Sequence, residues 1–290
     1  MKYILLLTFS LFCGAFSYGD DVSIKEVEFD SHGVKLSGSI VIPKNREVQS
    51  AVVFVHGSGK QTRNLYWARR FAAEGIAALV YDKRGAGRSG GEYEGDQSVS
   101  EKNIELLTDD SIAALKTLRQ NFKTRSMPIG LTGISQAGWI VPLAAKKSKL
   151  VDYIVLWSGP VCKVSEEDIF SKYTSDRDEK VVPSYETALK SRTEKYIWPD
   201  FLGRDTDSSE DLAALHIPGF WIFGESDGSI PVDLSIKNLQ SLRSVGHNYN
   251  FALFSGLGHN NMEETFATAT DWINRFSMGF QGGELKTNKY

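Results

Sequence analysis

Residues 128–145, PIGLTGISQAGWIVPLAA, run from a short apolar stretch into a helical pattern, with Ser135 at the junction. The first seven residues are typical of a buried strand, and AGWIVPLAA is typical of a helix. The pattern Gly-x-Ser-x-Gly is nearly complete, but Ala137 stands at its last position and Gly138 follows one place later. Small residues are needed there because backbone passes close to such a turn. The stretch predicts a sharp turn that exposes Ser135 at the carboxyl end of a strand.

Similar apolar runs recur along the chain and alternate with helical patterns. They are residues 51–57, 76–82, 152–159, 218–225 and 248–256. Runs of this kind are typical of strands buried on both faces. Their alternation with helices predicts an α/β fold with a mostly parallel sheet covered on both sides. Residues 23–29 and 34–42 instead alternate apolar and polar side chains around the turn DSHG. They predict an N-terminal antiparallel hairpin at the sheet edge.

One segment interrupts this alternation. Residues 160 to about 211 contain no central-strand pattern and combine many charges with aromatic side chains. Linkers seldom carry so many aromatics, so this segment is expected to be a helical lid inserted into one domain spanning residues 20–290.

The composition is that of an ordinary globular protein, with 41% hydrophobic residues, 24% charged residues and a net charge of −3. This charge gives no reason to expect nucleic acid or anionic lipid as a partner. Residues 1–19 place Lys2 before an apolar run and small residues, which predicts a secretory signal peptide and a secreted or periplasmic location. The alternatives are an uncleaved anchor and a buried N-terminal helix. Without the leader only Cys162 remains, so no internal disulfide is expected.

Ser135 needs a base before its hydroxyl can act as a nucleophile. His259 follows the last predicted strand, in FALFSGLGHNN, and is the expected base. The other candidates lie in a hairpin turn (His32), ahead of a strand (His216) and in a polar loop (His247). Those positions are typical of surface or packing histidines.

A carboxylate should orient the histidine and stabilise its cation. Asp227 lies in the turn GESDGSIP after the run 218–225, where a strand is expected to end, and is the first choice. Glu225 and Asp233 compete with it. Asp233 is the second choice because it is also a candidate helix cap.

An oxyanion site is expected in the loop HGSG, residues 56–59, directly after a predicted strand. The backbone N–H of Ser58, with Gly59 as an alternative, should act together with the N–H of Gln136. His56 is expected to brace this loop.

Taken in order, HGSG, YDKRGAGRSGG, GISQAG, GESDGSIP and GLGH resemble the α/β-hydrolase superfamily over residues 25–275. The resemblance implies a serine hydrolase that cleaves a carboxylic ester through an acyl-enzyme. Its expected substrate is a small-molecule ester or a short peptide, and neither a cofactor nor a metal is needed. Thioesters, peptides and non-catalytic ligand binding on the same fold remain alternatives.

A second glycine-rich string, GAGRSG at residues 85–90, matches the pattern of a dinucleotide-binding loop. Such a loop should open directly into a helix, whereas these glycines run into the polar stretch GEYEGDQS. No pair of His, Asp or Glu residues stands at metal-ligand spacing. Dehydrogenase and metal-dependent chemistry are therefore not expected.

Overall fold

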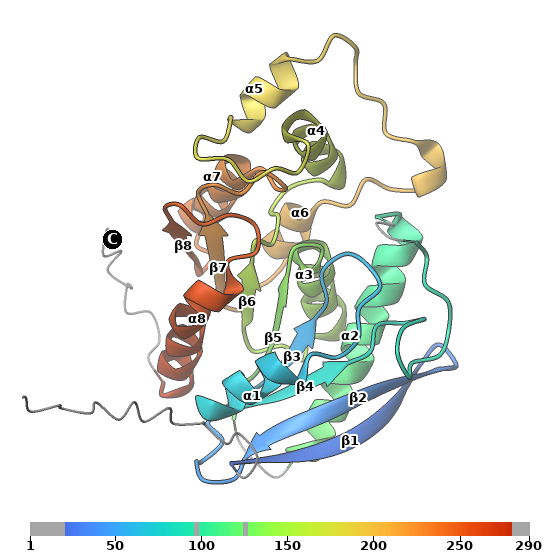
Figure 1. Cartoon of the computed structure of the whole chain (residues 1–290), viewed down its shortest axis with the longest axis vertical. Coiled ribbons are helices and arrows are strands. Elements are labelled where there is room, and N and C mark those ends of the chain that lie inside the picture. Colours follow the sequence, from blue (N-terminus) through green and yellow to red (C-terminus); the bar gives the residue numbers. More distant parts are fainter. Residues whose placement is uncertain (1–20, 96–98, 124–126, 280–290) are drawn as a thin grey trace, which may run out of the picture.

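The computed structural model describes residues 21–95, 99–123 and 127–279, so the proposed leader at 1–19 lies outside the described residues. The described residues form an eight-stranded sheet in the order β1-β2-β4-β3-β5-β6-β7-β8, with helices on both faces (Figure 1). The strands are β1 (Val22–Ser31), β2 (Val34–Pro43), β3 (Ser50–Val55), β4 (Ile76–Tyr81), β5 (Ile129–Ile134), β6 (Ile154–Trp157), β7 (Gly219–Gly224) and β8 (Tyr249–Phe254). Each lies within a residue or two of a predicted run.

The helices lie in the connections between strands, except α8, which follows β8. They are α1 (Leu65–Ala73), α2 (Glu101–Asn121), α3 (Ala137–Ser148), α4 (Val164–Thr174), α5 (Tyr185–Lys190), the 3₁₀ turn η1 (Asp200–Leu202), α6 (Ser208–Ala213), α7 (Val232–Ser244) and α8 (Met262–Ser277). Among the described residues, no helix combines the length and apolarity needed to cross a bilayer.

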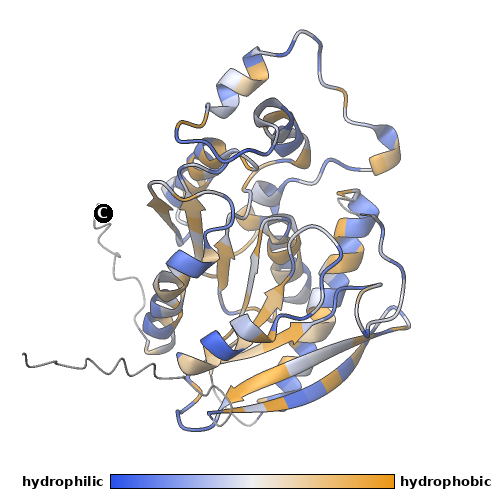
Figure 2. Ribbon diagram, viewed as in Figure 1, coloured by the Kyte–Doolittle hydropathy of each residue, from blue (hydrophilic) through white to orange (hydrophobic). Residues whose placement is uncertain are grey.

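The sheet is mixed in the way the patterns predicted. Strand β1 pairs antiparallel with β2, and β2 pairs antiparallel with β4. All the other pairings, from β4–β3 to β7–β8, are parallel. The antiparallel and parallel parts of the sheet differ in their hydropathy patterns (Figure 2). Strand β1 alternates polar and apolar residues, whereas the central strands are almost continuously apolar. The predicted α/β fold class is confirmed.

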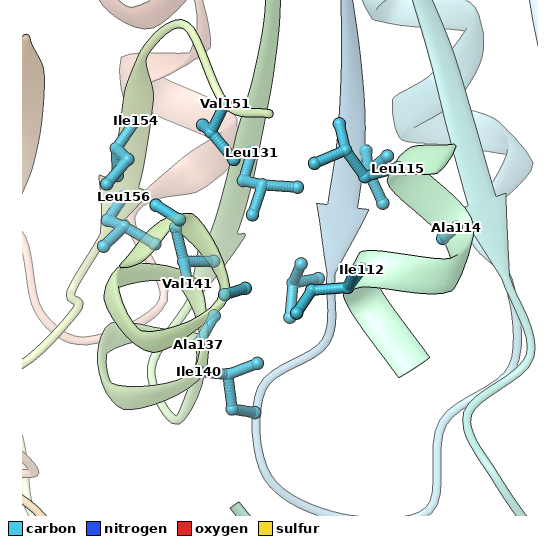
Figure 3. Close-up of a cluster of buried hydrophobic side chains, with 14 of the residues drawn as sticks. Ile112, Ala114, Leu115, Leu131, Ala137, Ile140, Val141, Val151, Ile154 and Leu156 are labelled. Atoms are coloured by element: carbon cyan, nitrogen blue, oxygen red, sulfur yellow. The ribbon is translucent and has the colours of Figure 1, made fainter. Parts of the chain in front are cut away.

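Alternate side chains of each central strand supply two separate cores. In β3, Val53 and Val55 pack with α2 and α3, while Val52 and Phe54 face α1 and α8 on the opposite side. Figure 3 shows part of the first core, where α2 and α3 meet over β5 and β6. Because β4, β3, β5, β6, β7 and β8 run parallel, their carboxyl ends lie at one edge of this doubly covered sheet.

The expected insertion leaves the sheet after β6 and carries α4, α5 and η1 to one end of the molecule (Figure 1). Within residues 160–211 the structure has helices and a single isolated bridge, between Lys163 and Asp207. The boundary near residue 211 falls inside α6, whose Leu212 is fully buried in the main core. The overhanging part of the segment therefore ends before α6.

Candidate active site

Ser135 occupies a strained turn between β5 and α3. Its φ of 57° lies in the left-handed region, which costs a non-glycine residue about 1–3 kcal/mol. The turn is held on both sides, because Ser135 N donates to Trp157 O at 3.0 Å and Gly138 N donates to Ser135 O at 2.7 Å. A strand-to-helix turn of this kind lifts the serine side chain off the end of the strand, as the turn of a nucleophile elbow does.

The structure explains the irregular glycine pattern around this turn. A Cβ at Gly133 would lie 2.5 Å from both Ala137 Cβ and Val55 O, so any larger residue at position 133 would force its neighbours to shift. The Ala137 methyl is fully buried and occupies the space that Gly133 leaves. A side chain at Gly138 would overlap Pro160, which follows β6. Gly138 therefore allows α3 to pack closely against Pro160 at the start of the insertion.

His259 and Asp227 are brought together from the loops after β8 and β7. His259 Nδ1 lies 2.9 Å from Asp227 Oδ2 and 3.0 Å from Oδ1. Oδ1 of this buried carboxylate also accepts from Ser229 N at 2.9 Å and Ile230 N at 3.1 Å. A carboxylate can only accept, so Nδ1 carries the proton and Nε2 is left as the basic nitrogen.

The competing acids lie elsewhere. Asp233, in the first turn of α7, accepts from the backbone N of Tyr185 at 3.0 Å. Glu225 is exposed, and its backbone N donates to Phe254 O. Among the described residues, neither carboxylate contacts His259.

The electrostatics around His259 favour its cation. Burial lowers the pKa of the imidazole, but the hydrogen bond and charge of Asp227 outweigh burial. The charges of Asp178 and Asp176 act in the same direction, so the pKa of His259 is raised above its usual value. An imidazole held in this way can take a proton from a nucleophile and retain it while an intermediate forms.

Ser135, His259 and Ser58 line one cavity of about 460 Å³ beneath the lid. Its apolar lining consists of Val99, Trp139, Pro160, Val164, Trp198, Pro199, Leu202 and Ile230. Within the described residues, Ser135 and His259 make no direct hydrogen bond with each other. Catalytic hydrogen bonds of this type commonly tighten only when substrate binds.

The HGSG loop is braced from behind, as expected for His56. The ring Nε2–H of His56 donates to Tyr81 O at 2.5 Å, and burial lowers its pKa to about 4, so the ring is neutral. Gln61 Nε2 donates to Ser58 O, and Lys83 Nζ donates to Gly57 O at 2.8 Å. These contacts hold the loop beside Ser135.

Two residues that support the histidine loop were missed in the sequence. Asp178, between α4 and α5, accepts from His259 N at 3.1 Å and from Gly228 N at 3.1 Å. It thereby joins the lid to both loops of the His–Asp pair. Ser158, after β6, donates to His259 O at 2.8 Å. Asp178 is one charge among many in its segment, so no local signal marks it.

Three carboxylates of the inserted segment also line the cavity, Glu167, Asp168 and Asp176. Burial, with the nearby charges of Asp176, Asp168 and Asp227, raises the pKa of Glu167 to about 8. Glu167 is therefore mostly a neutral acid at pH 7. Asp176 has a raised pKa as well, chiefly through burial. The carboxyl groups on this side of the cavity can donate hydrogen bonds to a polar substrate group or accept hydrogen bonds from it.

The glycine-rich string at residues 85–90 forms a loop of the fold. Gly87, at φ 53°, lies against the carboxylate of Asp82, which pairs with Arg63. The next helix begins only at Glu101. Cys162 is a buried free thiol whose pKa is raised by burial, as expected of a structural cysteine.

Comparison with known proteins identifies the family of this chain. Residues 46–213 match the family described as serine aminopeptidase, S33. A quorum-quenching protein, AidA of Acinetobacter baumannii, is 39% identical over 132 residues, which are 44% of this chain and 42% of that protein. The aligned part thus spans less than half of that relative.

Solved structures extend the likeness over most of the chain. An esterase of Pyrococcus furiosus is 22% identical, with a TM-score of 0.60 over 89% of this chain and 91% of its own. An acylaminoacyl peptidase of Pyrococcus horikoshii is 19% identical, with a TM-score of 0.64 over 93% of this chain and 42% of its own. At these identities the likeness shows the shared fold.

Proposed function

The chain belongs to the serine aminopeptidase S33 family of α/β-hydrolases, and from that premise we propose that it hydrolyses carboxylic esters through an acyl-enzyme on Ser135. The observation that carries the proposal is the position of Ser135. It stands at a left-handed turn and lines the same cavity as His259, which is paired with the buried Asp227.

We propose the following mechanism, which these contacts support. His259 Nε2 takes the proton of Ser135 as Oγ attacks the ester carbonyl. The N–H groups of Ser58 and Gln136 stabilise the oxyanion, and Asp227 stabilises the histidine cation. His259 then protonates the leaving alcohol. A water molecule, deprotonated by the same histidine, releases the acid from Ser135 by the reverse steps.

The cavity suggests the size of the substrate. Its volume of about 460 Å³ suits a small molecule. Trp139 and Trp198 offer an apolar surface for an acyl or alcohol group, and Glu167 and Asp176 offer polar contacts on the lid side. A short or medium ester with one polar substituent is the substrate class that we propose.

The test uses p-nitrophenyl esters of increasing acyl length with the purified protein and its Ser135→Ala variant. We expect the substitution to abolish turnover and to prevent labelling by a fluorophosphonate, with the adduct mapped to Ser135 by mass spectrometry. Turnover by Ser135→Ala close to the wild-type rate would rule out the assignment.

Amide hydrolysis is the second candidate. The family description names an aminopeptidase, and Asp168 and Asp176 place carboxyl groups where an amine-bearing substrate could bind. A panel of matched esters, thioesters, aminoacyl-naphthylamides and quorum-sensing signals separates these reactions by kcat/KM. The signals are included because the Acinetobacter relative is named a quorum-quenching protein. Labelling of Ser135 without turnover of any substrate would favour a binding protein.

We also propose that the chain is exported. The support is the basic and apolar pattern of residues 1–19. Expression of the full chain, followed by fractionation and N-terminal sequencing, should yield a mature protein that begins near residue 18 or 20. An intact N-terminus on cytoplasmic material would contradict this proposal.

A further inference from the structure

Lys83 is a buried cation beside the oxyanion loop. It follows β4, and only 3% of its surface is exposed. Its Nζ lies 2.8 Å from Gly57 O, 3.2 Å from Gly59 O and 3.0 Å from Gln136 Oε1. An ammonium has three donors, and here three acceptors surround it. All three acceptors belong to the two segments that supply the expected oxyanion donors.

The contact between Lys83 Nζ and Gly57 O also fixes the direction of the Ser58 N–H, because both groups belong to one peptide unit. The described residues contain no cis peptide bonds, so the C=O of Gly57 and the N–H of Ser58 point in opposite directions across one planar unit. Because Lys83 holds the carbonyl of this unit, the Ser58 N–H points away from Lys83. Ser58 lines the catalytic cavity on that other side.

The contact between Lys83 Nζ and Gln136 Oε1 links Lys83 to the turn that holds Ser135. Gln136 follows the nucleophile, and its side-chain oxygen accepts from the same ammonium that holds Gly57 and Gly59. One side chain thus sets the distance between the HGSG loop and the first turn of α3. The separation of the two oxyanion donors depends on that distance.

The charge of Lys83 adds an electrostatic effect. Among the described residues, no carboxylate lies within ion-pair distance of its Nζ, and the nearby Asp82 pairs with Arg63. Burial lowers the pKa of Lys83 to about 8, so the amine is mostly protonated at pH 7. A buried ammonium polarises the peptide units that it contacts and favours negative charge on their far side.

We propose that Lys83 is a positioning residue of the oxyanion site, aligning the Ser58 and Gln136 amides and stabilising the oxyanion through its charge. The inference rests on the proposed function, since it requires acyl transfer at Ser135. It assigns a role to the residue between Asp82 and Arg84 in YDKRGAGRSGG that local sequence patterns do not indicate.

The test compares three variants. Lys83→Met keeps an unbranched side chain but removes the charge and the donors, while Lys83→Arg keeps both. Lys60→Met is the matched control, because Lys60 follows the HGSG loop but is exposed. For Lys83→Met we expect kcat on a p-nitrophenyl ester to fall about 10²–10³-fold, as for loss of an oxyanion donor, with KM changed less than threefold.

A tetrahedral inhibitor supplies an independent readout. A boronic acid that adds to Ser135 places an oxyanion in the site, so its Ki should rise in Lys83→Met in parallel with the loss of kcat. A purely structural role would change KM and the melting temperature without this parallel. Lys83→Arg should recover at least part of kcat, and Lys60→Met should behave as wild type.

The pH profile tests the charge itself. Above pH 8 the wild-type amine loses its proton and turns a lone pair toward one of its three acceptors, so kcat should decline. In Lys83→Arg this decline should move to higher pH, because a guanidinium does not titrate in this range. Among the described residues, the titratable groups near Lys83 include His56, Asp82 and Tyr93, whose ring centroid lies 5.7 Å from Nζ. The pKa values of His56 and Asp82, about 4 and about 2, lie far below this range.

The outcomes separate the two proposals. If Ser135→Ala is inactive but Lys83→Met, with its fold verified by circular dichroism, keeps more than a third of wild-type kcat, the role of Lys83 is refuted and the proposed function stands. If Ser135→Ala is active, both fail. If Lys83→Met does not fold, Lys83→Gln, which removes the charge and shortens the reach to the three acceptors, takes its place, and a folded Lys83→Gln that keeps more than a third of wild-type kcat would overturn the proposal.

Discussion

Replacing Asp227 by asparagine should change the tautomer of His259 while leaving the fold intact. In the structure Oδ1 accepts from two backbone amides, Ser229 N and Ile230 N, and lies 3.0 Å from His259 Nδ1, whereas Oδ2 lies 2.9 Å from Nδ1 and, among the described residues, accepts from no backbone amide. An asparagine at position 227 must place its side-chain oxygen at the Oδ1 position. In the opposite orientation its NH₂ group would face the backbone N–H groups of Ser229 and Ile230, and donors would oppose donors. Its NH₂ group then donates to Nδ1.

This forced orientation gives the size of the effect. With Nδ1 as acceptor, the proton of the neutral imidazole moves to Nε2, which can no longer accept the proton of Ser135. We expect kcat to fall about 10³–10⁴-fold, or roughly 4–5.5 kcal/mol of transition-state stabilisation. KM should change little. Both backbone amides keep their acceptor, so the melting temperature should stay within a few degrees.

The assay is the initial rate of p-nitrophenyl butyrate hydrolysis at pH 8, with thermal melting measured on the same samples. Asp233→Asn is the matched control and should retain nearly full activity, because Asp233 contacts Tyr185 N instead of His259. Retention of more than a tenth of kcat by Asp227→Asn would refute the reasoning. A larger loss in Asp233→Asn would transfer the role of the acid to that residue.

Three further outcomes follow from the site. Because the pKa of His259 is raised and its neutral form is the base, kcat/KM should fall as the pH drops through a midpoint above the ordinary pKa of histidine; a midpoint below that ordinary value would contradict this. Gly133→Ala should cost about 1–3 kcal/mol by overpacking, and lower the melting temperature by roughly 3–10 °C. Adding Ala137→Gly should restore only part of this loss, since the contact with Val55 O remains; full recovery would show that the backbone yields. Asp178→Ala should reduce kcat several-fold by releasing the His259 loop, and unchanged kinetics would show that the lid contact is dispensable.

Much of the site could be predicted because its parts follow strand ends directly. Ser135 comes immediately after β5, while Asp227 and His259 lie a few residues beyond β7 and β8. The carboxyl ends of parallel strands share one edge, so residues in these positions converge once the sheet is recognised. Apolar periodicity reveals the sheet, since burial on one or both faces imposes it on every strand.

Tertiary structure alone decided which residues hold this arrangement in place. Asp178 reaches His259 from 81 positions away, and Lys83 reaches Gln136 across 53. Neither Asp178 nor Lys83 belongs to a periodic sequence pattern, because each makes its contact from a loop. Such a contact depends on how two loops that are distant in sequence pack together. The position of Gly138 became intelligible in the same way, from the packing of Pro160 against it. Sequence determined the elements and the order of the reactive groups, whereas contacts between distant loops decided how those groups are aligned.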